Sequence, residues 1–71
     1  MIDPIYETLQ KVATMPDNCL DNFKNTAIHA SLYARRETAR AILSGHNTQE
    51  VKEYFNYQNK LIIDYFCLYN I

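Results

Sequence analysis

Four polar side chains between residues 29 and 40 stand at the spacing that places them on one side of a helix. They are His29, Tyr33, Arg36 and Arg40, separated by four, three and four residues. An arginine guanidinium can hold a phosphate with two hydrogen bonds, and histidine and tyrosine add hydrogen bonds or a stacking plane. One hypothesis is therefore a module that sequesters a nucleotide or a short nucleic acid through this His/Tyr/Arg row.

The charge of the chain favours a simpler explanation of the same row, a solvent-exposed helix face. Seven basic and eight acidic residues give a net charge of -1 at pH 7, which provides no long-range attraction for nucleic acid, and Glu37 lies beside the row. A helix-turn-helix interpretation, with Asn56, Asn59 and Lys60 facing DNA bases, has the same weakness because acidic residues on that helix would face phosphates.

The cysteines and histidines match no metal or catalytic motif. They are Cys19, His29, His46 and Cys67, and no two of them have Cys-x-x-Cys or His-x-x-x-His spacing. A thiol nucleophile would also need a histidine and an orienting group nearby, which no long loop is available to assemble. We therefore expect no enzyme activity, no metal and no cofactor. Because no basic and apolar leader follows Met1, we expect a cytoplasmic protein with both thiols free.

Helices are the expected elements, because the chain has only one glycine and two prolines. Asp3 as a cap and Pro4 at the first helical position predict a short first helix, which residues 14–16 end. At 71 residues the chain has room for one domain, and we assign 1–71 to a single helical domain.

Two longer helices are predicted to follow. The first is expected to run without interruption from residue 17 or 18 to about residue 44, with Gly45 as its left-handed cap. The second is expected to begin at a capping box, Asn47 to Glu50, and to continue almost to Ile71. The short break between them predicts an antiparallel hairpin. The predicted fold class is all-α: a short N-terminal helix packed across a long two-helix hairpin, as a three-helix bundle.

The last helix is expected to bury an apolar stripe against the others. Its members recur every three or four positions, at Val51, Tyr54, Phe55, Leu61, Ile62, Tyr65, Phe66 and Tyr69. A domain of this size buries only about 60% of the surface that its unfolded chain exposes. We therefore expect part of the apolar surface to meet a second copy or another protein, so that the chain is oligomeric.

Four residues of the last helix are the expected contacts with a partner: Tyr57, Ile63, Cys67 and Leu68. Ile63 and Cys67 share a face that is otherwise polar, and a tyrosine offers a large contact area at an interface. The main hypothesis is a small cytoplasmic regulator or inhibitor that occupies the surface of a partner protein. The residue usage is typical of an A+T-rich genome, so we expect a phage or mobile element as the source. Apolar runs such as 61–63 are far shorter than the stretch of about 20 residues that a membrane span needs, so we expect no membrane span.

Overall fold

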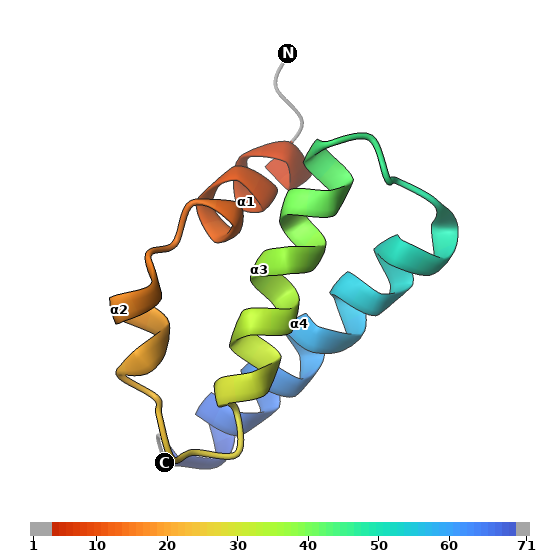
Figure 1. Ribbon diagram of the computed structural model, residues 1–71. Helices are drawn as coiled ribbons and strands as arrows, with labels where there is room; N and C mark the ends of the chain where they lie inside the picture. Colours follow the sequence, from red (N-terminus) through yellow and green to blue (C-terminus); the bar gives the residue numbers. More distant parts are fainter. Residues whose placement is uncertain (1–3, 70–71) are drawn as a thin grey trace.

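Four helices make up the protein in the computed structural model, which describes residues 4–69 (Figure 1). They are α1 (Pro4–Ala13), α2 (Asp17–Asp21), α3 (His29–Leu43) and α4 (Gln49–Tyr69). The described residues form no strand, which confirms the all-α class. The count of four replaces the three helices predicted from the sequence.

Helix α3 is central, because each of the other helices packs against it. Figure 1 shows α1 and α2 along one side of α3, with α4 crossing the other side obliquely. Helices α3 and α4 run in opposite directions, as predicted, and α1 packs across α3. The arrangement is a compact globule of obliquely crossing helices.

The predicted continuous helix over 17–44 is wrong, because residues 22–28 form turns between α2 and α3. Asn25 has a φ of 73°, a left-handed conformation that asparagine tolerates better than most residues. The Thr26 hydroxyl donates to the carbonyl of Phe23, so a side chain replaces the helical hydrogen-bond pattern. Phe23 and Ala27, which were expected on a helix, lie in this connection instead.

The cap at the end of α3 follows the prediction. Gly45 has a φ of 105°, which a residue with a side chain rarely adopts. The amide of His46 donates to Ala41 at 2.9 Å, and that of Gly45 donates to Ile42 at 3.1 Å, so the last carbonyls of the helix are satisfied. This tight turn reverses the chain and directs α4 back along α3.

The start of α4 differs from the prediction by one residue. The amide of Val51 donates to the Thr48 hydroxyl at 3.3 Å, so Thr48 acts as the cap in place of Asn47. The two predicted positions at the chain ends, the Asp3 cap and the helix end near Ile71, lie outside the described residues.

The core has two parts, both built on α3. The first core cluster joins α1, α3 and α4 and consists of Leu9, Val12, Ala13, Ala39 and Phe55. The second joins α2, the 22–28 connection, α3 and α4 and consists of Leu20, Ile28, Leu32 and Ile62. Phe23 extends the second cluster, with its ring edge-on to Phe66 at 5.5 Å between centroids. Leu20 is therefore the buried apolar side chain through which the short α2 contacts the rest of the core.

Replacing Leu20 with alanine tests this attachment. Leu20 is 1% exposed, so Leu20→Ala should lower the free energy of unfolding by about 2–5 kcal/mol, through lost burial and the cavity left behind. Urea unfolding followed by circular dichroism measures the change. The neighbouring Cys19 is exposed, so Cys19→Ala is the matched control and should change stability by less than about 0.5 kcal/mol. Equal effects of the two substitutions would contradict the assignment.

Candidate protein-binding surface

Helix α4 exposes a row of large side chains on the side that does not face α3. Tyr54, Tyr57, Leu61 and Leu68 have exposed fractions of 48%, 58%, 38% and 70%. With the exposed Asp64 they stand three, four, three and four residues apart, the heptad spacing at which two helices pack along a common line. We call these five residues the outer seam of α4.

The prediction that the whole apolar stripe of α4 is buried is wrong, because two of its members belong to the exposed outer seam. Phe55 and Ile62 are buried as predicted, but Tyr54 and Leu61 are exposed. The apolar arc of α4 is wider than the surface that α3 can cover, so its edge remains in solvent. The side chain of Tyr69, the last member of the predicted stripe, lies outside the described residues.

The four predicted partner contacts are all exposed, but they lie on two sides of α4. Tyr57 and Leu68 are about three turns apart and belong to the outer seam. Ile63 and Cys67 lie on the other flank, where they line a shallow depression with Ile62 and Phe66. A single flat partner surface cannot contact both sides at once, and the seam has the larger set of exposed apolar side chains.

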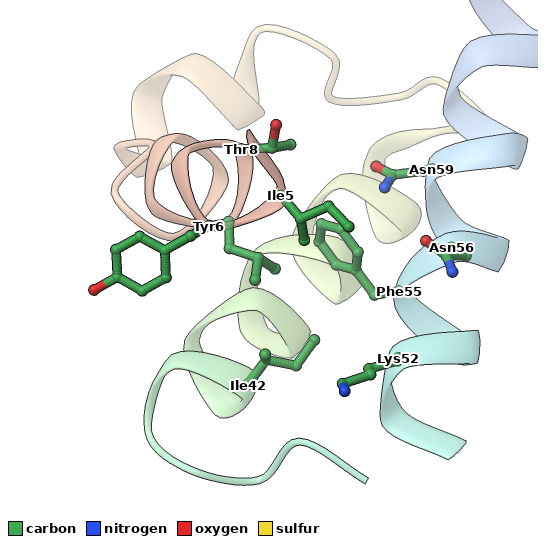
Figure 2. A pocket seen from close by; sticks show the side chains of 9 residues that line it. Ile5, Tyr6, Thr8, Ile42, Lys52, Phe55, Asn56 and Asn59 are labelled. Carbon is green, nitrogen blue, oxygen red and sulfur yellow. The ribbon is translucent and has the colours of Figure 1, made fainter. Parts of the chain in front are cut away.

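A groove of about 500 Å³ separates α1 from α4 above α3. Its lining residues are Ile5, Tyr6, Thr8, Leu9, Ile42, Lys52, Phe55, Asn56 and Asn59. Figure 2 shows Ile5 directed towards Phe55, Tyr6 directed away, and the polar Lys52, Asn56 and Asn59 along the α4 wall. No sequence pattern predicts this groove, because its walls come from three helices and local spacing does not encode how those helices cross.

A hydrogen bond from α3 holds the side chain of Asn59 in this groove. Its side-chain carbonyl accepts a hydrogen bond of 3.2 Å from Arg35 of α3. Arg35 is half-buried, and this burial lowers the pKa of its guanidinium. The contact ties α3 to α4 and leaves the groove with an apolar floor and one polar wall.

The predicted His/Tyr/Arg row lies on α3, where its first two members share one acceptor. The Tyr33 hydroxyl donates to Asp21 Oδ1 at 2.7 Å, and His29 Nε2 lies 3.2 Å from the same oxygen. The hydrogen bond from Tyr33, followed by that from His29, lowers the pKa of the Asp21 carboxyl. The same bond raises the pKa of Tyr33. Both residues therefore hold α2 against α3.

Arg36 makes the deepest contacts of the row. It is 5% exposed, and its Nη1 pairs with Asp17 and donates to the Met15 carbonyl at 3.1 Å. Its guanidinium carbon lies 4.9 Å from the centroid of the Tyr33 ring. The hydrogen bond with Asp17 raises the pKa of Arg36. The residue fastens the start of α2 to the middle of α3.

Arg40 completes the row at the end of α1. Its Nε donates to the carbonyl of Ala13 at 2.8 Å, where a helix end favours a positive charge, and its Nη1 lies 3.2 Å from Glu37. All four residues of the row thus have partners within this chain. Sequence spacing placed them on one helix face, but only the fold brings Asp17 and Asp21 opposite them.

The other reactive groups of the described residues do not gather into a site. Residues 4–69 contain no cluster of three or more histidine, cysteine or acidic side chains that could hold a metal ion. Cys19 and Cys67 are free and exposed. None of the described helices is both long and apolar enough to cross a membrane. No family model, curated protein or solved structure matches the chain.

The Asp21 contacts predict a dependence of stability on pH at both ends of the scale. A carboxyl with a lowered folded pKa stabilises the fold above its unfolded pKa of about 3.9, and this stability is lost as pH falls through the folded value. Tyr33, whose pKa is raised, stabilises the fold below about pH 10, and that stability is lost as pH rises further.

Asp21→Asn tests both effects. The variant should be less stable at neutral pH, and its stability should change less than that of the wild type between about pH 5 and pH 2. Tyr33→Phe keeps the ring and the carboxylate, so it should remove the part of the alkaline loss that Tyr33 causes and part of the acid loss. Urea unfolding across the pH range measures these slopes. An acid slope in Asp21→Asn equal to that of the wild type would rule out this role for the carboxylate.

Proposed function

We propose that this protein is a small protein-binding regulator or inhibitor, which acts by docking the outer seam of α4 on the surface of another protein. The single observation that supports the proposal is the exposure of four large apolar side chains, from 38% to 70%, on one line of one helix. Contiguous exposed apolar surface on a small protein usually marks an interaction site.

The chemistry of the seam suits recognition by a helix or a groove. Two of its members are tyrosines, which bury a large area while the hydroxyl remains available for a hydrogen bond. Leu61 and Leu68 supply aliphatic surface, whose burial contributes about 25 cal/mol per Å². The mode of binding that follows is an amphipathic helix laid along an apolar surface.

The opposite side of α4 keeps the seam in place. Phe55 and Ile62 anchor the helix in the two core clusters, one near each half of the seam. A surface on a packed helix loses little conformational freedom on binding, so more of the contact energy appears as affinity. The seam is therefore a preformed docking surface.

The His/Tyr/Arg row gives less support to the alternative of nucleotide or nucleic-acid binding. Arg36 is buried and pairs with Asp17, and Arg40 donates to Ala13 and Glu37. A phosphate would have to compete with these internal partners and to overcome the negative net charge of the whole chain.

The substitution Leu61→Lys tests the proposal. It places a charge in the middle of the seam without touching the buried face, so the fold should persist while binding to the partner falls at least about 10-fold. The immobilised wild-type chain and the immobilised variant are each incubated with a host lysate, and the captured proteins are compared. The affinity of both chains for each captured protein is then measured. Circular dichroism checks the fold.

Ile63→Lys is the matched control, because Ile63 is also an exposed apolar residue of α4, at 60%, but lies on the other flank. Binding should be retained in this variant. Loss in Ile63→Lys with retention in Leu61→Lys would transfer the site to the flank of Cys67, and equal binding by all three chains would refute the proposal.

A further inference from the structure

The outer seam contains one charged residue, Asp64, and this residue restricts what can pack there. It is exposed, and among the described residues it forms no ion pair. A carboxylate within an otherwise apolar seam loses water when the seam is covered, so the covering surface must offer a positive charge or a hydrogen-bond donor. Any partner of the seam therefore needs a group of this kind opposite Asp64.

Lys60 provides such a charge on α4 itself. It is exposed, lies one turn before Asp64 at the edge of the seam, and likewise forms no ion pair among residues 4–69. Resting on the function proposed above, we infer that in the absence of the other protein a second copy of this chain occupies the seam, packed antiparallel along α4. Tyr57 then lies against Leu68 of the second copy, and Asp64 lies beside Lys60 of the second copy.

The direction of the two helices follows from the position of the carboxylate. In a parallel pair each seam residue faces its own equivalent, so the two Asp64 side chains would meet and repel each other. An antiparallel pair separates them, because residues at equal distances from the twofold axis face one another. The parallel arrangement is therefore disfavoured by the sequence of the seam itself.

One register brings Lys60 of each copy beside Asp64 of the other. With the twofold axis between residues 62 and 63, position 57 faces position 68, and position 61 faces position 64. Lys60 is then offset from Asp64 of the second copy by one residue, about 1.5 Å along the axis. Both tyrosine-to-leucine contacts and both ion pairs form together, once on each side of the axis. The contact is also closed, so it produces a dimer and no filament.

The remainder of the protein leaves room for this contact. The α4 residues that line the groove opposite α1 are Lys52, Phe55, Asn56 and Asn59, and none of them belongs to the seam. Figure 1 shows α4 beginning to the right of α3 and crossing behind its lower end, with α1 and α2 to the left of α3. A second α4 can therefore approach along the seam without meeting α1 or α2.

Exchange of the two charges tests the dimer. Lys60→Asp and Asp64→Lys each place like charges opposite one another, so each alone should weaken self-association at least about 10-fold. The double variant Lys60→Asp with Asp64→Lys should restore the wild-type affinity, and a mixture of the two single variants should form a mixed dimer. Lys52→Asp, on the groove side of α4, is the matched control and should leave association unchanged. Sedimentation equilibrium measures each constant, with circular dichroism as the check on folding.

A disulfide tests the register independently. In a background of Cys19→Ser and Cys67→Ser, the pair Tyr57→Cys and Leu68→Cys should form a bond between position 57 of one chain and position 68 of the second copy under mild oxidation. The two positions in one chain are about 16 Å apart along the helix, too far for an internal disulfide. A covalent dimer supports the antiparallel pairing. Its absence at concentrations where the protein is dimeric overturns this register.

The outcomes separate this inference from the proposed function. A wild-type chain that is monomeric at about 100 µM, or a dimer that ignores the charge exchange, overturns the inference. The proposed function still stands in that case if Leu61→Lys loses a captured protein. Conversely, a dimer that responds to the charge exchange, with capture of other proteins unaffected by Leu61→Lys, supports the inference and refutes docking of the seam on a different protein.

Discussion

The fold depends on one constraint: a single helix, α3, supplies the packing surface for the other three. The buried guanidinium of Arg36 fixes how that surface is divided, because its bonds to Asp17 and Met15 hold the start of α2 on one side of α3. Removing such a group would leave an unpaired carboxylate or carbonyl at the contact. Helix α4 packs on α3 as well, and its inner side meets α1 through Phe55 and α2 through Ile62 in the two core clusters. None of the described helices covers the outer seam of α4.

The parts of the fold that could be predicted from the sequence are those governed by local rules. The bounds of α1, the glycine cap at Gly45 and the burial of Phe55 and Ile62 follow from capping chemistry and helical periodicity. The break before α3 could not be predicted in this way. The residues around it are compatible with a helix, and it is the left-handed Asn25, together with the packing of Phe23 on Phe66, that favours the turn.

The outer seam of α4 shows what helical periodicity cannot predict. Periodicity identified an apolar stripe on α4 but not how much of it α3 would cover, so Tyr54 and Leu61 were placed in the core and are exposed. It also placed Tyr33 and Arg36 on one face, where they resemble an anion site. Their acceptors, Asp21 and Asp17, come from a segment that folds back on α3, and such a long-range contact leaves no trace in local spacing.

The distribution of ion pairs separates the two halves of the molecule. Every ion pair between described residues involves a side chain of α3: two join α3 to α2, two lie within α3, and none involves α4. The charges on the α2 side are consequently occupied in holding the chain together, while Lys60 and Asp64 remain available beside exposed apolar residues. Binding requires both contact area and polar groups that gain a partner on association. Helix α4 has both an exposed contact area and charged groups without an ion pair to another described residue. Its outer seam is therefore the better candidate for a binding surface, although the histidine, tyrosine and arginines of the α3 row are residue types that often bind ligands.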